Sequence, residues 1–358
     1  MVLDVLPNAT AEDEIELQES FIMRRSALTT ILALLILTPA VTGVAEAEVS
    51  FRPTPGAVEV LFDGEVFTRY IHEIDPSKAM AAEGVLLTKP VLFPLRAPSG
   101  VTVTRGWPFE RIEGERQDHP HHIGLYFTYD RINGSNFWNN SRNPLPAIRH
   151  VRAELATDGD GRPALKTLAH WIGKDGNALL SETRLMSFIP GQDQNIMDIS
   201  IELEAIADKV EFGDTKEGMF AIRLAQWLTE NTDSRYAQGT GTYLNVHGDR
   251  KEQGVWGKRA EWVRIEGQKD GETIGIAILN HPSSTNYPTY WHARGYGAFS
   301  ANPLGQYAFQ KSRKVDNPQP FNLVLEKGQS APFKFRVIIY EGSRTRQQLD
   351  NAFQEYAR

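Results

Sequence analysis

The sequence contains no cysteine among its 358 residues. This absence excludes disulfides, thiolate nucleophiles, iron–sulfur clusters, lipoprotein anchoring and zinc sites built on cysteine. A metal ion in this protein would have to be bound by His, Asp, Glu or Asn side chains.

An excess of positive charge is also missing. The formal net charge is −7 at pH 7, and Lys and Arg form no long run. Proteins that bind nucleic acid or anionic lipid usually concentrate positive charge on one surface. We therefore expect neither partner, and 41% hydrophobic residues are enough for a large globular core.

Long hydrophobic runs are confined to the N-terminal region. Met23-Arg24-Arg25 precedes the apolar stretch "ALTTILALLILTPAV", and Ala45-Glu46-Ala47 matches a cleavage site. We predict that residues 1–47 are an N-terminal extension and signal peptide starting at about Met23, and that the mature protein is periplasmic or secreted. A membrane anchor is the alternative, although the run is short for a bilayer span of about 20 residues.

After residue 48, hydrophobic and polar residues alternate as they do in strands. The segment "VEVLFDGEVFTRYI" predicts a hairpin that turns at Asp63-Gly64, and "IMDISIELEAI" predicts a strand with one buried face. Further strands are expected in "GLYFTY", "TIGIAIL", "FNLVLE" and "FKFRVIIY". Because no amphipathic helices alternate with these strands, we predict that residues 48–358 form a single all-β domain, a large antiparallel β-sandwich.

One helix is predicted, at the C-terminus. Leu349, Phe353 and Tyr356 recur at helical spacing, and Ser343 is a suitable N-cap before them. This short helix should cover an edge or an end of the sandwich.

Three histidines stand close together in "QDHPHHIGLYF". In an extended backbone His119 and His121 would project from one face, where they could bind one metal ion. Pro120 places the segment at a sheet edge or in a loop, and Asp118 could orient one imidazole, while His122 would point the other way. The alternative is that these rings merely pack on neighbouring aromatic side chains, but the cluster favours a function.

Other stretches contain candidate binding groups. "NHPSSTNYPTYWHARGYGAFSANP" has a tryptophan beside histidine and arginine, which suits a sugar site because indole stacks on a sugar ring while planar donors hold its hydroxyls. The structural alternatives are a packed aromatic corner, a solvated Lys-Glu pair and a rim loop spanning residues 89–100. The candidates from these stretches are Lys89, Lys216, Glu217, Arg223, His281, Trp291, His292 and Arg294.

The same stretches resemble a bacterial family that is known either as methane oxygenase PmoA or as a domain of unknown function. The matching residues are "KPVLFPLRAPSGVTVTRGWP", "DHPHHIGLYFTYDRINGSNFW", "GDTKEGMFAIR" and "HPSSTNYPTYWHARGYGAFSANP", within about Val58 to Tyr340. Ile123 and Ser284 depart from the family pattern, in which Arg and Asn are expected, so Ile123 is not counted as a site residue.

This resemblance implies an exported protein whose relatives are often encoded beside sugar-catabolism genes. It also implies a fold similar to the galactose mutarotase-like and polysaccharide-lyase sandwiches. It does not imply methane oxidation, because that enzyme's subunit crosses a membrane several times and this chain has no apolar span after its signal segment.

The leading hypothesis is an exported enzyme that acts on a sugar or glycoside, as a lyase, an epimerase or a hydrolase. An imidazole near residue 120 would serve as general acid or base, with His281 or His292 as its partner. Positive side chains would stabilise a developing oxyanion or help to hold the substrate, and Trp291 would stack on the ring. The positive candidates are Lys89, Lys216, Arg223 and Arg294.

Two alternatives remain open. In a metal-dependent hydrolase or oxygenase, His119, His121, Glu217 and His281 or His292 would hold a divalent ion. In a non-catalytic carbohydrate-binding protein, aromatic and polar side chains would bind a small-molecule or oligosaccharide ligand without reaction. Both enzymatic hypotheses require that imidazoles near residues 120 and 290 face one concave surface.

Overall fold

The computed structural model describes residues 47–74, 84–230 and 233–358. The predicted signal peptide lies almost entirely outside these described residues. From Ala47 onward the chain forms one compact unit. Within the described part, no helix is both long and apolar enough to cross a membrane.

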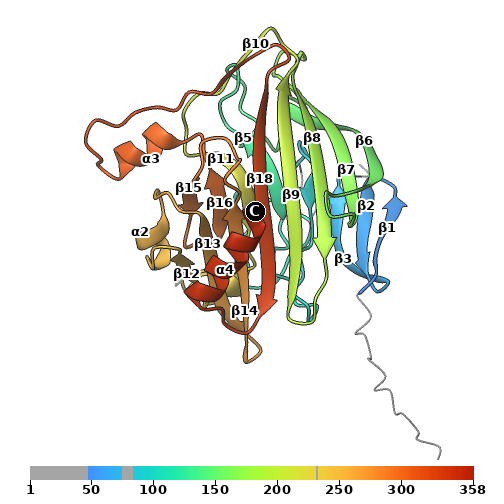
Figure 1. Cartoon of the computed structure of the whole chain (residues 1–358), viewed down its shortest axis with the longest axis vertical. Coiled ribbons are helices and arrows are strands. Elements are labelled where there is room, and N and C mark those ends of the chain that lie inside the picture. Colours follow the sequence, from blue (N-terminus) through green and yellow to red (C-terminus); the bar gives the residue numbers. More distant parts are fainter. Residues whose placement is uncertain (1–46, 75–83, 231–232) are drawn as a thin grey trace, which may run out of the picture. The chain divides into compact units, whose positions relative to one another are not determined.

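The predicted hairpin at Asp63-Gly64 forms part of the first of two large sheets (Figure 1). Both turn residues have positive φ angles, 49° and 84°, as a tight hairpin turn requires. The strand order of this sheet is β1-β2-β3-β4-β5-β11-β16-β15. Its strands are β1 Val49–Thr54, β2 Ala57–Phe62, β3 Glu65–Ile71, β4 Val91–Leu92, β5 Leu125–Tyr129, β11 Gly218–Arg223, β15 Tyr290–Ala293 and β16 Ala298–Asn302.

The second sheet also has eight strands, in the order β12-β13-β14-β18-β9-β8-β7-β6. Its strands are β6 Ala147–Thr157, β7 Pro163–Ile172, β8 Ala178–Ile189, β9 Gln194–Ala205, β12 Thr242–Asn245, β13 Trp262–Lys269, β14 Glu272–Asn280 and β18 Ser330–Glu341. A small ribbon pairs β10 Lys209–Glu211 with β17 Val324–Glu326. Neighbouring strands pair antiparallel, so the predicted all-β antiparallel sandwich is confirmed.

The core lies between the two sheets, and strand alternation explains its composition. In β9 the apolar residues from Met197 to Ala205 are buried, as the "IMDISIELEAI" pattern predicts. From the first sheet Phe220 stacks on Phe335 of the second, with ring centroids 4.3 Å apart. Residues next to these core positions must face away from the core, because successive side chains in a strand point to opposite sides.

The predicted C-terminal helix is α4, Arg346–Tyr356. Its N-cap is Thr345 and not Ser343, because the Thr345 hydroxyl accepts a hydrogen bond from the backbone N–H of Gln348, which closes a capping box. Leu349 and Phe353 pack on the outer face of the second sheet, so the helix covers a face and not an edge.

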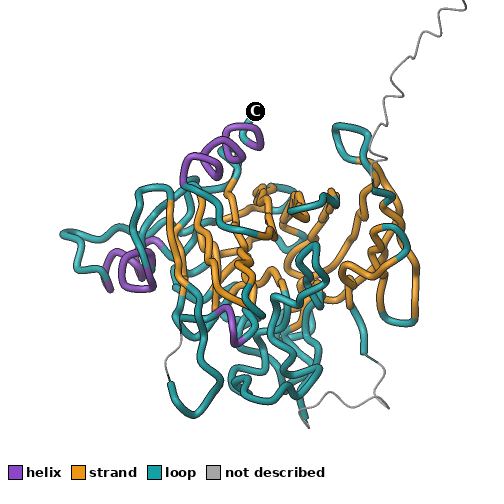
Figure 2. The backbone as a smooth tube through the Cα atoms, turned by 90° about the horizontal axis from the view of Figure 1, so that it is seen from below, coloured by secondary structure: helices purple, strands orange, loops and turns teal. Residues whose placement is uncertain are grey.

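Loops cover the opposite side of the sandwich. Figure 2 shows strands in the middle, α4 on one side and a mass of loops on the other. Short helices interrupt the loops: η1 Gln226–Leu228, α2 Lys251–Val255 and α3 Gln306–Ser312. The outer face of the first sheet and its loops form the surroundings of the candidate site.

Candidate functional site

Four adjacent strands of the first sheet place one row of side chains on its outer face. The register pairs Tyr126 with Ala221, Ala221 with Ser300, and Ser300 with His292. Their neighbours in each strand belong to the core between the sheets, so this row faces the loops. Because Ala221 and Ser300 have small side chains, the middle of the row rises less far above the sheet than its two ends, Tyr126 and His292.

A second row joins the segments near residues 120 and 290. Arg223 pairs with Ala298, and the backbone N–H of Arg294 donates to the Ala298 carbonyl at 2.8 Å. The guanidinium groups of Arg223 and Arg294 lie 4.8 and 5.7 Å from the centre of the Tyr296 ring. Arg294 is also paired with Glu252 of α2, with its Nε 3.0 Å from a carboxylate oxygen.

The histidine segment lies in a loop, one of the two positions expected for it, and forms a tight turn instead of the extended backbone that would place His119 and His121 on one face. The His122 N–H donates to the His119 carbonyl at 2.9 Å, and His119 has a φ of 44°. The physical reason is Arg105, which is 2% exposed and donates to the carbonyls of Asp118, His119 and His122 at 2.8, 3.1 and 3.0 Å. An extended chain could not bring these three carbonyls to one guanidinium.

Asp118 connects this turn to the sheet. One carboxylate oxygen lies 2.8 Å from Arg105 and 2.7 Å from Arg223, and the other lies 3.2 Å from Nδ1 of His119. Burial alone would raise the pKa of Asp118, but the hydrogen bond with His119 and the charges of Arg223 and Arg105 outweigh it and hold the pKa well below its usual range. Asp118 is thus a fixed carboxylate that orients His119.

The His119 ring is the most accessible imidazole of the turn. Its side chain is 42% exposed, and its ring lies parallel to that of Tyr296, with centroids 5.5 Å apart. On its other flank it stacks on His122 at 5.0 Å. Because Nδ1 faces Asp118, Nε2 is the atom available for proton transfer to a ligand.

The other two imidazoles of the turn are neutral near pH 7. Burial, together with the charges of Lys89, His119 and nearby arginines, lowers the pKa of His121 to about 2. Burial also lowers the pKa of His122 well below its usual value. His122 lies with Nδ1 3.3 Å from Arg223 and its ring against the edge of Trp138, so it packs beneath the turn.

Lys89 is buried beneath the same turn and is not on a rim loop as the sequence suggested. It is 2% exposed, and its Nζ lies 5.2 Å from the centre of the Tyr126 ring. Burial lowers the pKa of Lys89 to about 7. A lysine in this state can exchange a proton near neutral pH.

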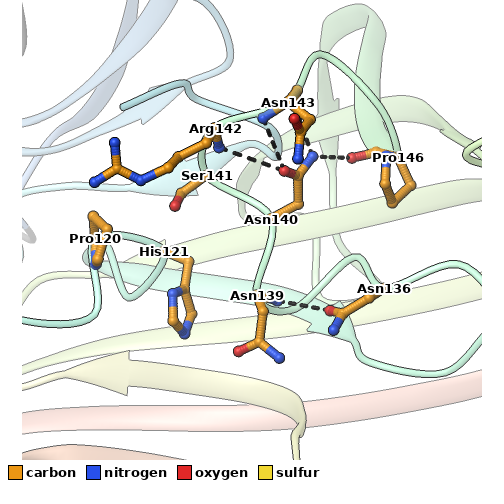
Figure 3. A pocket seen from close by; sticks show the side chains of 9 residues that line it. All are labelled: Pro120, His121, Asn136, Asn139, Asn140, Ser141, Arg142, Asn143 and Pro146. Carbon is orange, nitrogen blue, oxygen red and sulfur yellow. Dashed lines mark hydrogen bonds between the residues drawn. The ribbon is translucent and has the colours of Figure 1, made fainter. Parts of the chain in front are cut away.

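A cavity of about 500 Å³ opens beside His121 (Figure 3). Its wall comes from the histidine turn and from the loop between β5 and β6. The lining residues are Pro120, His121, Asn136, Asn139, Asn140, Ser141, Arg142, Asn143 and Pro146. His121 of the histidine turn is thus part of the cavity wall.

Three predicted site residues do not meet the histidine turn as expected. Trp291 is fully buried in the core and donates to the Ala260 carbonyl at 2.9 Å, so it cannot stack on a sugar. His281 follows β14 and contacts Tyr356 of α4, which covers the second sheet and not the first. His292 lies in the row of Tyr126 but is buried beside Trp256, and burial and the charge of Arg294 lower its pKa to about 3.

Lys216 and Glu217 lie in the turn that leads into β11. Their side chains form an ion pair with an N–O distance of 2.7 Å and remain partly exposed. The charge of Glu217 acts on both Tyr126 and Tyr296, which places the pair beside the site. They therefore border the site, and the charge of Lys216 contributes to the lowered pKa of His292.

Sequence reasoning missed several residues of this site. Arg105 was one of them. It follows Val101 and Val103 at a spacing of every second residue, and this pattern could have indicated a buried arginine. Tyr296 lay within a quoted stretch but was not selected. The stretch of asparagines after Trp138 had no signal beyond its composition.

No group of three His, Asp or Glu residues in the described ranges is arranged to hold a metal ion. The carboxylate of Asp118, which lies beside the histidines, already forms ion pairs with Arg105 and Arg223. The suggested metal ligands His119 and His121 have ring centroids 5.7 Å apart and nearly perpendicular rings.

Residues 57–354 match the model of a family described as a family of unknown function (DUF6807). The chain belongs to this family. The match corrects the resemblance to the PmoA-like family, because the family model that fits the chain is a different one. No curated protein matches the chain.

Solved structures similar to the chain include three proteins described as carbohydrate-active. A polysaccharide lyase is 12% identical, with a TM-score of 0.32, over 87% of this chain and 34% of its own. A 4-alpha-glucanotransferase from Thermococcus litoralis is 10% identical, with a TM-score of 0.32, over 83% and 40%. A galactose mutarotase related enzyme from Lactobacillus acidophilus is 10% identical, with a TM-score of 0.27, over 83% and 98%. The chain spans well under half of the lyase and the glucanotransferase.

Proposed function

We propose that this protein is an exported enzyme that acts on a carbohydrate by acid/base chemistry, with His119 as the proton-transferring group. The supporting observation is the contact between Nδ1 of His119 and a carboxylate of Asp118 that two buried arginines hold in place. A fixed carboxylate sets the tautomer of an imidazole and leaves its outer nitrogen for catalysis. Export rests on the signal peptide predicted within residues 1–47.

Lyase, epimerase and hydrolase chemistry each remove a proton at one atom and deliver one at another. His119 would take the proton through Nε2. Lys89, whose pKa burial lowers to about 7, could return a proton. Tyr296, parallel to the His119 ring at 5.5 Å, helps to hold that imidazole in place.

The test uses the purified full-length chain and a panel of glycosides and oligosaccharides, with products detected by mass spectrometry. His119→Ala should lower turnover by about 10²- to 10⁴-fold. His281→Ala, at the opposite side of the sandwich, should leave turnover unchanged. The proposal fails if no carbohydrate is converted, or if His119→Ala reacts as fast as the native chain.

Elemental analysis of the same preparations tests the metal-dependent alternative. Stoichiometric metal that is lost in both His119→Ala and His121→Ala would replace the acid/base proposal by a metal-dependent one. Tight binding of an oligosaccharide without any conversion would instead favour a non-catalytic carbohydrate-binding protein.

A further inference from the structure

Most residues that line the cavity beside His121 have polar side chains, and none of them is acidic. Its volume of about 500 Å³ is within the range of small-ligand sites, roughly 300–1,000 Å³. Asparagine amides, one serine and one arginine supply most of the polar groups. A ligand here would meet hydrogen-bond donors and positive charge, without a carboxylate to repel an anion.

Some of these groups are already used by the loop itself. The Asn140 amide nitrogen donates to the carbonyls of Asn143 and Pro146 at 2.8 Å, and its oxygen accepts from the Asn143 N–H at 3.1 Å. Asn140 therefore shapes the loop and is not a ligand contact. Asn136 uses its oxygen to accept from the Asn139 N–H at 2.8 Å, which leaves its amide N–H groups.

The side chains of Asn139 and Arg142 remain available to contact a ligand. In Figure 3 the Asn139 side chain lies below the loop near His121, and the Arg142 side chain extends over Pro120. Arg142 is exposed, and among the described residues its guanidinium forms no ion pair. A guanidinium binds a carboxylate through two parallel hydrogen bonds, a geometry that no other side chain offers.

Positive charge also lies behind the cavity wall. Lys89 is near enough to His121 for its charge to act on that ring, and no carboxylate pairs with it among the described residues. His121 itself is neutral and can donate or accept a hydrogen bond at the wall. The groups around the cavity thus favour an anionic ligand that also has hydroxyls.

We propose that this cavity binds a carboxylate-bearing sugar, a uronic acid unit, with Arg142 on the carboxylate and Asn136 and Asn139 on the hydroxyls. This inference rests on the proposed function and names its substrate class. The reacting bond would then lie beyond His121, toward His119.

The experiment measures binding of a galacturonic acid trisaccharide and of the matching neutral galactose trisaccharide to the full-length chain by calorimetry. The acidic sugar should bind at least about tenfold more tightly, since one Arg–carboxylate contact can supply that factor. Arg142→Gln should remove the preference, and Arg142→Lys should retain part of it. Arg152→Gln, an exposed arginine on β6, is the matched control and should behave as the native chain.

Equal affinity for the two sugars, or an unchanged preference in Arg142→Gln, would overturn this inference. His119→Ala separates it from the proposed function, because that variant should lose turnover and keep uronate binding. If uronate binds through Arg142 but no sugar is converted, the inference holds and the enzymatic proposal fails. If neutral sugars are converted and Arg142→Gln has no effect, the enzymatic proposal holds and this inference fails.

Discussion

The guanidinium of Arg105 donates to both the carboxylate and the backbone carbonyl of Asp118, each at 2.8 Å. The same side chain reaches the carbonyls of His119 and His122. Arg105 itself is held outside the turn, where its backbone N–H donates to the Arg223 carbonyl at 3.0 Å. The conformation of the histidine turn is therefore set by residues of the sheet and its adjoining loop.

Replacing Arg105 tests this relationship. Arg105→Lys keeps the charge but cannot reach several carbonyls at once with planar donors, so buried acceptors lose their partners. We expect the free energy of unfolding in urea to fall by about 2–4 kcal/mol and the turnover to fall with it. Arg131→Lys, which is largely exposed, should change neither quantity. A fully stable and active Arg105→Lys variant would contradict this role.

Lys89 should make stability depend on pH. Its folded-state pKa of about 7 is below its usual value of 10.5, so between these values the unfolded chain binds the extra proton. The stability of the native protein should therefore rise with pH across this window, and the burial penalty is present in full below pH 7.

Lys89→Met removes the buried charge. The variant should be more stable than the native protein by on the order of 3 kcal/mol at pH 6, and this difference should shrink as the pH approaches 10. Urea unfolding at pH 6, 7.5 and 9 measures it, with the exposed Lys216→Met as control. A difference that stays constant with pH would show that Lys89 keeps its ordinary pKa.

A buried ion pair inside the sandwich gives a further prediction. Arg184 lies 2.6 Å from Glu182 on β8, both are almost fully buried, and Trp171 donates to the same carboxylate at 2.9 Å. Arg184→Met leaves Glu182 charged and unpaired and should lower the free energy of unfolding by about 3–5 kcal/mol. The double variant Glu182→Leu, Arg184→Met should be more stable than the single one. If the two losses are instead additive, the two side chains contribute independently and their pairing has no coupling energy.

The capping box of α4 can be tested with two neighbouring residues. Thr345→Ala removes the hydroxyl that accepts from Gln348 and should lower the free energy of unfolding by about 1 kcal/mol. Ser343→Ala, at the position that the sequence pattern suggested, should change it by less than about 0.5 kcal/mol. Thermal unfolding of the two variants compares them directly, and a larger loss for Ser343→Ala would place the cap there.

The fold was predictable where one face of a strand is buried. In β9 every second residue from Met197 to Ala205 is apolar, and this simple alternation needs no knowledge of distant residues. The strand β6 escaped prediction because it exposes residues such as Val151 and Leu155, so its pattern lacks a clear buried face.

The site was predictable only in part. The cluster at residues 119–122 was visible in the sequence itself. Its proximity to residues near 290 was a requirement of the enzymatic hypotheses, which the sequence alone could not establish. The conformation of the turn could not be predicted, because it depends on hydrogen bonds from Arg105, a residue outside the turn. His281 and Trp291 were predicted as site residues from their residue types alone. In the structure His281 contacts Tyr356 of α4, and Trp291 points into the core.

The base of the candidate site is formed by a row of four side chains, Tyr126, Ala221, Ser300 and His292. Ala221 and Ser300 belong to strands that have hydrogen-bonded neighbours on both sides, so the base of the site is rigid and narrow. The histidine turn and the asparagine loop stand above it on separate connections. Selectivity for new ligands could thus evolve by exchange of loop residues, while the proposed proton-transferring group His119 keeps its position.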